Sequence, residues 1–172
     1  MTEELVHLRL SILESNFEEA LAIVDQLEAM SRQAILRNIQ SFLDRMMMHL
    51  IKNQVEQKLT NYCAASILAS VIGIKRLNLK ANKTFYYIQR DEWDAILEES
   101  LKLAITYASV DTMNGQLSPF QLSELVDKTQ INLAAEKLID LTYVYSTRDL
   151  AEIVPNFLAQ LPGGEDWKQG KR

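Results

Sequence analysis

Glycine and proline are scarce in this 172-residue chain, and their scarcity limits the folds open to it. The chain holds five glycines and three prolines, with no glycine before Gly73 and no proline before Pro119. A sheet domain needs many tight turns, and tight turns depend on these two residues. The sequence therefore predicts helices that are separated by polar caps.

Apolar residues recur at helical spacing along most of the chain. The fold predicted from this spacing is an all-α, irregular bundle of about six or seven helices, with no sheet of consequence. The expected helices cover about residues 2–15, 16–30, 31–57, a segment from Cys63 to Ile74, 91–115, 118–145 and 146–161. Pro155 lies deep within the last of these, so a kink or two short helices are expected there.

Polar residues mark several of the expected helix starts. Asn16 is followed by Glu19 at the spacing of a capping box. Asp91 is expected to cap the helix that follows it. Residues 78–90 interrupt the helical pattern with a basic, turn-like stretch and then an aromatic one. We expect them to form an extended loop whose aromatic side chains dock onto the bundle.

The expected organisation is a single helical domain over residues 1–161. Within it, residues 128–161 form a C-terminal helical extension. Pro162, Gly163 and Gly164 are predicted to end the regular structure, because proline and glycine are poor helix formers. The polar stretch 162–172 is then expected to be mobile.

Charge and composition argue against several classes of function. The formal net charge of −5 disfavours general binding to nucleic acid or to an anionic membrane. The single Cys63 allows neither an internal disulfide nor a thiolate metal cage. No apolar run approaches the roughly 20 residues of a membrane span, and the acidic start differs from the basic start of a secretory signal. We therefore expect a cytoplasmic protein, with no cofactor, metal site or catalytic set.

Cys63 would be a candidate nucleophile only if a base lay beside it. It falls on the same helical stripe as Ile67 and Val71. A thiol on an apolar stripe is expected to be buried and inert.

The methionine cluster is the first candidate interaction surface. Met47, Met48 and Ile51 lie away from the main apolar stripe of their helix, and Met48 and Ile51 share a face with Asp44. A helix that is apolar nearly all round is either enclosed by neighbouring helices or covered by a partner. The sequence leaves both interpretations open.

The second candidate surface is the basic, aromatic stretch over 75–90. Basic residues interleaved with aromatic rings are typical of single-stranded nucleic-acid platforms. Cations near a helix C-terminus are also typical of ordinary helices, because they complement the helix dipole. The candidate contacts are Lys75, Arg76, Lys80, Lys83, Tyr86 and Tyr87.

Two segments resemble a bacterial family known as domain of unknown function 29. They are Leu27-Glu28-Ala29-Met30-Ser31-Arg32 and Met46-Met47-Met48-His49-Leu50-Ile51-Lys52. The resemblance covers about residues 1–127 and implies a compact all-α fold. It implies no activity, and it leaves Met30, Arg32 and His49 as motif residues of unknown role.

The leading functional hypothesis is a noncatalytic helical adaptor or regulator that acts through a protein partner or through self-association. The alternative is a nucleic-acid-associated regulator that uses the loop over 75–90. An enzyme without a recognisable motif is the third hypothesis.

Overall fold

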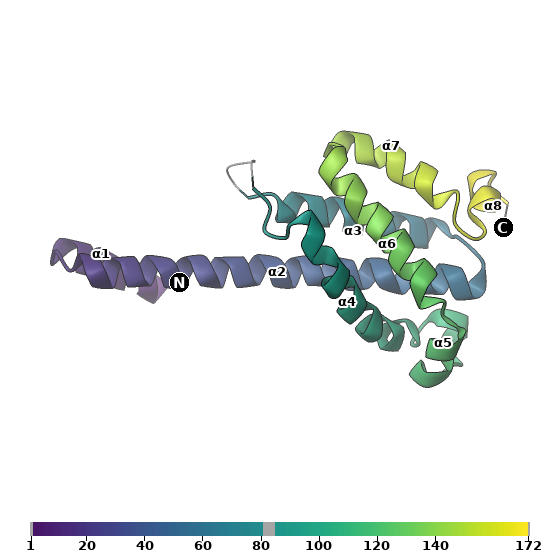
Figure 1. Cartoon of the computed structure of the whole chain (residues 1–172), viewed down its shortest axis with the longest axis horizontal. Coiled ribbons are helices and arrows are strands. Elements are labelled where there is room, and N and C mark those ends of the chain that lie inside the picture. The colour runs from purple at the N-terminus through teal and green to yellow at the C-terminus, as the bar shows by residue number, and fades with distance from the viewer. Residues whose placement is uncertain (1, 81–84, 172) are drawn as a thin grey trace. The chain divides into compact units, whose positions relative to one another are not determined.

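The computed structural model describes residues 2–80 and 85–171, and most of these residues are helical. The α-helices described there are α1 (Thr2–Leu13), α2 (Phe17–Glu56), α3 (Asn61–Asn78), α4 (Trp93–Ala108), α5 (Pro119–Leu125), α6 (Lys128–Val144), α7 (Thr147–Leu158) and α8 (Gly164–Lys168) (Figure 1). Two short 3₁₀ helices, η1 (Arg90–Glu92) and η2 (Thr112–Gly115), precede α4 and α5. Within the described residues, β-pairing is limited to one isolated bridge between Leu79 and Tyr86. The all-α prediction is confirmed.

The chain divides into two compact units, and the boundary falls inside α2. We call residues 1–38 the N-terminal helix pair and residues 39–172 the main unit. Compactness does not establish which of them folds independently, so the single domain expected over 1–161 stays a prediction. Each unit is described by itself below.

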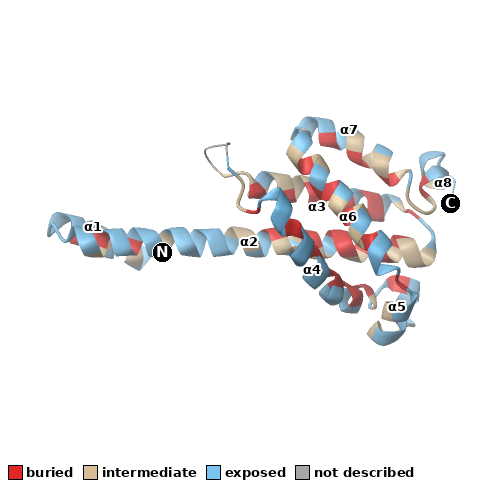
Figure 2. Ribbon diagram, in the orientation of Figure 1, coloured by how far each residue is buried: buried red, intermediate tan, exposed pale blue. Residues whose placement is uncertain are grey.

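The main unit is built around α3 and α6. α3 lies against α6 and α7, and α4 lies against α5 and α6. The buried residues of these helices, red in Figure 2, form the core. Each large apolar side chain buried there stabilises the fold by about 1.5–3 kcal/mol. The largest of the fully buried side chains are Ile39, Leu43, Met46, Met47, Leu50, Ile51, Ile67, Ile74, Leu97, Leu122, Leu138 and Ile139.

Gly73 serves as a packing residue inside α3. A Cβ atom at this position would lie 2.7 Å from the ring of Phe42 on α2. Glycine costs about 1 kcal/mol relative to alanine inside a helix. That cost is offset here by the close approach of the phenylalanine ring.

α2 continues through Ser31, where the sequence predicted a boundary between two helices, so that boundary is wrong. Serine costs a helix interior at most about 0.7 kcal/mol relative to alanine. No glycine or proline lies nearby to end the helix. The predicted start is confirmed, since the Asn16 side chain accepts a hydrogen bond from the Glu19 backbone N–H at 3.4 Å and donates one to the Glu19 carboxylate at 2.7 Å.

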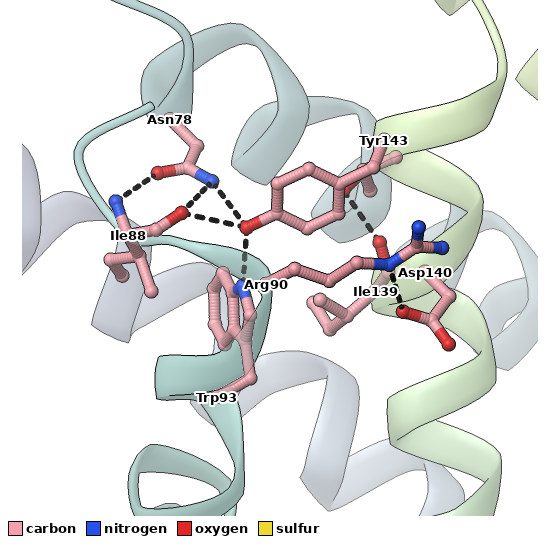
Figure 3. A network of polar contacts seen from close by, with 8 residues as sticks. Asn78, Ile88, Arg90, Trp93, Ile139, Asp140 and Tyr143 are labelled. Atoms are coloured by element: carbon pink, nitrogen blue, oxygen red, sulfur yellow. Dashed lines mark hydrogen bonds and ion pairs between the residues drawn. The ribbon is translucent and has the colours of Figure 1, made fainter. Parts of the chain in front are cut away.

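A polar network ties Ile88, at the end of the described stretch 85–89, to Asn78 of α3 and to Tyr143 of α6 (Figure 3). Tyr143 Oη donates to the Ile88 carbonyl at 2.7 Å and accepts from Trp93 Nε1 at 2.6 Å. Asn78 Nδ2 donates to Tyr143 Oη at 3.0 Å, and Asn78 Oδ1 accepts from the Ile88 N–H at 2.7 Å. This segment therefore docks on the bundle as predicted, although the network was not foreseen.

Asp91 does not cap a helix, so that prediction is wrong. It lies inside η1, and α4 begins only at Trp93. The hydrogen bond that caps η1 is made by Gln89, whose backbone N–H donates to the Glu92 carboxylate at 2.6 Å. A 3₁₀ turn thus stands where the sequence predicted the first turn of the α-helix.

The C-terminal helices differ from the predicted ones in two places. The stretch over 118–145 is split into α5 and α6, because Asp127 caps α6 by accepting the Gln130 N–H at 3.2 Å. Pro155 lies inside α7, which is one helix, so of the two predicted alternatives, a kink or two short helices, the second is wrong. A helix can retain proline when packing offsets the lost hydrogen bond, and Val154 and Leu158 on either side are fully buried.

Regular structure does not end at Pro162, because α8 follows it. Gly163 has a φ of 69°, which favours glycine, and a Cβ at Gly164 would lie 2.4 Å from the Leu158 carbonyl oxygen. Trp167 Nε1 then donates to Asn61 Oδ1 at 2.8 Å. The two glycines therefore form a tight turn that returns the chain to the start of α3, and the prediction that regular structure ends at Pro162, Gly163 and Gly164 is wrong.

Candidate interaction surface

A tight turn connects the two helices of the N-terminal helix pair. Ser15 takes a left-handed conformation with a φ of 58°, and the Asn16 N–H donates to the Ser11 carbonyl at 2.8 Å. Farther along the pair, His7 Nε2 lies 3.1 Å from Glu19 Oε1. α1 therefore lies alongside the first turns of α2.

The buried side of this pair is small and partly polar. Ser11 of α1 is 2% exposed, and Ala20 and Ile23 of α2 are also buried. Leu8 and Leu27 continue these faces as half-buried residues. α1 thus buries a serine at the centre of its inner side, which is unusual for an amphipathic helix.

The large apolar side chains of the pair are mostly exposed. Leu13 is 73% exposed, Leu21 64% and Phe17 62%. Figure 2 shows α1 and the first half of α2 largely in the colour of exposed residues. We call the exposed large apolar residues the apolar set: Leu5, Val6, Leu10, Ile12, Leu13, Phe17, Leu21, Val24 and Met30.

Single exposed apolar residues are normal on a protein surface, but a concentration of them marks an interaction site. This set lies within one 38-residue unit. A unit below about 40 residues rarely buries enough surface to be stable without metals, disulfides or association. Two helices alone cannot cover each other's apolar residues, so a further layer would stabilise the pair.

The pair also carries most of the net charge of the chain. Residues 1–38 contain seven acidic and three basic residues, which gives −4, whereas residues 39–172 contain sixteen and fifteen, which gives −1. The residues of the apolar set therefore lie among acidic side chains. Polar groups around an apolar patch are typical of protein-binding surfaces.

The sequence could have revealed this surface. The apolar residues of α1 spread well beyond a narrow stripe, which is the same feature that made the methionines of α2 a candidate surface. The inference failed at the next step, because periodicity shows that a helix is apolar without showing which side its neighbours cover.

Two of the three residues of the predicted methionine surface are enclosed within the fold. Met47 and Ile51 are fully buried, and Met48 is half-buried. Enclosure by neighbouring helices is therefore the correct interpretation for Met47 and Ile51. Their proposed role at a partner interface is corrected.

Asp44 is the polar residue that shares a helix face with Met48 and Ile51, and its side chain has partners within the fold. Its carboxylate accepts hydrogen bonds from Ser100 Oγ at 2.8 Å and from Gln40 Nε2 at 2.7 Å. Ser100 is itself fully buried. A polar residue on a helix face is therefore a poor sign of exposure when another helix supplies its hydrogen-bond partner.

Cys63 is 2% exposed, which confirms the predicted burial. A base does lie beside it, however, since His49 Nδ1 is 3.3 Å from Cys63 Sγ. The Tyr62 ring packs edge-on to His49 at 5.3 Å. Burial, followed by the positive charge of Lys52, lowers the pKa of His49. The pair has the composition of a nucleophile and its base, but burial of both side chains keeps a substrate from the sulfur.

The basic, aromatic stretch uses its side chains within the fold. Tyr86 packs against Tyr143 with ring centroids 4.6 Å apart, and Lys80 Nζ lies 5.4 Å from the centroid of the Tyr87 ring. Lys75 Nζ donates to the Thr142 carbonyl at 2.6 Å, and burial lowers its pKa.

These contacts occupy rings that a nucleic-acid platform would need to stack on bases. Arg76 is exposed, whereas Lys83 lies outside the described residues. The structure therefore places Lys75 in α3 against Thr142, whereas Tyr86 packs on Tyr143 and Lys80 lies near the Tyr87 ring.

The residues of the family resemblance fall in different surroundings. Met30 and Arg32 are exposed in the N-terminal helix pair, while His49 is buried in the main unit beside Cys63. The described residues hold no group of three or more His, Cys, Asp or Glu side chains placed to bind a metal ion. Every described helix is too short or too polar to cross a membrane.

Comparison of the chain with protein-family models, with curated proteins and with solved structures finds no match. The resemblance to the domain of unknown function 29 therefore stays a prediction from the quoted segments.

Proposed function

We propose that this protein is a noncatalytic helical interaction protein that acts through the apolar set of its N-terminal helix pair. The interaction covers that set with another protein chain, either a different protein or a second copy. The observation that carries the proposal is the exposure of nine large apolar side chains within one 38-residue unit. Relationship to the domain of unknown function 29 and a cytoplasmic location are further parts of the same proposal.

The main unit supports this division of roles. Its described residues include a large buried apolar core, and its exposed large apolar side chains are spread over a unit more than three times as long as the helix pair. The buried pair of Cys63 and His49 is shielded from substrates. The chemistry of the described residues thus favours binding over catalysis.

The test compares matched pairs of exposed residues in the two units. Phe17→Ser with Leu21→Ser removes part of the apolar set, and Phe120→Ser with Val144→Ser removes residues of similar exposure from the main unit. Full-length proteins are used as bait in host extract, and their masses in solution are measured over a range of concentrations.

We expect wild type and the Phe120/Val144 variant to associate, and the Phe17/Leu21 variant to lose at least about tenfold in affinity. Absence of any association by wild type would contradict the proposal. Equal association by all three proteins would contradict it as well.

A further inference from the structure

The main unit contains a pocket that is separate from the apolar set. It lies where the last turns of α2, the first half of α6 and the end of α7 with the turn after it come together (Figure 1). Its volume is about 340 Å³. Small-molecule sites have volumes of roughly 300–1,000 Å³, so this pocket has room for one small organic molecule.

Much of the pocket wall is apolar. Leu50 is 2% exposed and Ile131 3%, and Phe157 lines the pocket as a half-buried ring. Ala134 and Leu161 contribute further apolar surface. Such a wall favours a ligand with an apolar body, because binding removes both apolar surfaces from water.

One end of the pocket presents an unsatisfied amide oxygen. Asn53 is 2% exposed and lines the pocket. Its Nδ2 donates to the Pro162 carbonyl at 2.7 Å and to the Lys58 carbonyl at 3.2 Å, whereas no described residue donates a hydrogen bond to its Oδ1. Buried polar groups are nearly always hydrogen-bonded. Asn53 Oδ1 therefore favours a ligand that brings a donor.

Gln54 fixes where along α6 this end lies. Its side chain accepts from the Asp127 N–H at 2.9 Å and donates to the Asp127 carbonyl at 3.1 Å. Asp127 caps α6, and Asn53 adjoins Gln54 in the chain. Asn53 therefore lies near the start of α6, where Gln130 also lines the pocket.

Lys137 provides the charge. Among the described residues that line the pocket, it alone is charged. It is exposed and forms no ion pair with a described residue. Asp140 lies three residues further along α6, but it pairs with Arg90 at 3.0 Å. A free cation beside an apolar wall favours a ligand with one negative group.

The two polar ends are separated by an apolar stretch of α6. Lys137 follows Gln130 by seven residues, which is about 10 Å along a helix. Ile131 and Ala134 lie between them and line the pocket. The pocket therefore suits an elongated molecule with an acid at one end and a hydrogen-bond donor at the other.

We propose that this pocket binds a small monocarboxylate whose apolar chain carries a hydroxyl group at its far end. Lys137 pairs with the carboxylate, the apolar wall covers the chain, and Asn53 Oδ1 accepts a hydrogen bond from the hydroxyl. This inference goes beyond the proposed function, because the pocket belongs to the main unit and the apolar set to the N-terminal helix pair.

The test titrates the full-length protein with three probes by isothermal titration calorimetry. The main probe is 8-hydroxyoctanoate, since an extended eight-carbon chain spans about 10 Å, as about three residues of extended backbone do. Octanoate lacks the hydroxyl and 1,8-octanediol lacks the carboxylate. We expect a dissociation constant on the order of 0.1–1 mM for 8-hydroxyoctanoate. Octanoate should bind about two- to tenfold more weakly, and the diol about two- to fivefold.

Three variants test where the probe binds. Lys137→Gln should weaken binding of 8-hydroxyoctanoate by about two- to fivefold and leave the diol unchanged, because only the carboxylate meets the charge. Ala134→Trp fills the pocket and should weaken both probes by at least about tenfold. The control Lys102→Gln changes an exposed lysine of α4 and should bind as wild type does. Circular dichroism checks that every variant stays helical.

The variant with Phe17→Ser and Leu21→Ser separates the pocket from the apolar set, and it should bind 8-hydroxyoctanoate as wild type does. Loss of binding in that variant, with Ala134→Trp unaffected, would overturn the assignment to the pocket. Absence of saturable binding by wild type up to about 10 mM would overturn the site itself. Equal affinity for all three probes, with no effect of Lys137→Gln, would overturn the roles of Lys137 and Asn53.

Discussion

α1 and α3 contain similar residues but differ sharply in what they bury. In α3, Ile67, Val71 and Ile74 are fully buried, whereas Val6 and Leu13 of α1 are 55% and 73% exposed. α3 lies against both α6 and α7, while α1 shares its unit with the first part of α2. Helical spacing of apolar residues therefore determines that a helix forms, and the number of neighbouring helices determines how much of it is buried.

The largest expected effect comes from introducing a charged side chain at a buried position of the main unit, with an exposed position of the N-terminal helix pair for comparison. Met47→Glu buries an unpaired carboxylate in the main unit and should reduce the free energy of unfolding by several kcal/mol, about 3–5. Leu21→Glu places the same charge on an exposed position of α2. It should change that free energy by less than about 0.5 kcal/mol. Urea titration followed by circular dichroism measures both changes.

Met48→Glu sharpens the same test, because Met48 is only half-buried. Its side chain can turn the new carboxylate partly towards water, so the loss should fall between those of the other two variants. Losses of equal size for Met47→Glu and Leu21→Glu would show that Met47 is not enclosed in solution.

The second prediction concerns the network around Tyr143, which holds the loop to the main unit (Figure 3). Tyr143→Phe removes the hydroxyl that serves the Trp93 indole and the Ile88 carbonyl. Leaving such partners unsatisfied should cost about 1–3 kcal/mol. The matched control is Tyr107→Phe, since Tyr107 is 44% exposed, and it should cost less than about 0.5 kcal/mol.

The two tyrosine variants also test whether the hydroxyl acts as a donor. Burial raises the pKa of Tyr143, so the hydroxyl stays protonated at neutral pH and can donate to Ile88. Amide hydrogen exchange should accelerate at Ile88 in Tyr143→Phe and remain unchanged in Tyr107→Phe. Unchanged exchange in both variants would show that the network does not fix the loop.

Features that depend on neighbouring residues could be predicted from the sequence. The helical class, the Asn16–Glu19 cap and the burial of Cys63 follow from spacings of a few residues. Features that depend on distant partners could not. Tyr143 lies 65 residues from Asn78, and Trp167 lies 106 residues from Asn61.

The location of the candidate interaction surface could not be predicted for the same reason. The sequence singled out one helix as apolar beyond a narrow stripe, and it left open whether neighbouring helices or a partner cover Met47 and Ile51. Neighbouring helices enclose both residues, whereas the exposed Leu13 and Phe17 were not among the candidates. The decision between the two regions required knowing which helices pack together, and that packing depends on contacts far apart in the sequence.

The third prediction uses the buried histidine of the main unit against the exposed histidine of the helix pair. Burial and the nearby Lys52 lower the pKa of His49 below its usual 6.5. Below pH 6.5 the unfolded chain therefore binds a proton that the folded chain resists. The resulting stability is present above pH 6.5 and is lost as the pH falls towards the lowered pKa.

Wild type should lose more free energy of unfolding between about pH 6.5 and 5 than His49→Gln does. His7→Gln should retain the loss that is due to His49, because it leaves the buried His49 and its surroundings in place. Denaturant titrations at several pH values measure the difference. Parallel pH profiles for wild type and His49→Gln would show that His49 is accessible to protons in the folded state.

The smallest expected effect separates stability from association. Phe17→Ser removes a side chain that is 62% exposed in the N-terminal helix pair, and Phe120→Ser removes one that is 85% exposed in the main unit. Neither residue is part of the buried core, so each variant should unfold the main unit within about 0.5 kcal/mol of wild type.

Only Phe17→Ser should weaken the dependence of the thermal midpoint on protein concentration, because association produces that dependence in wild type and in Phe120→Ser. Circular dichroism melts over about a hundredfold range of concentration measure this dependence. Such a difference between two variants that leave the main unit equally stable assigns the role of Phe17 to association. A concentration-independent midpoint in wild type would remove the distinction between the two regions.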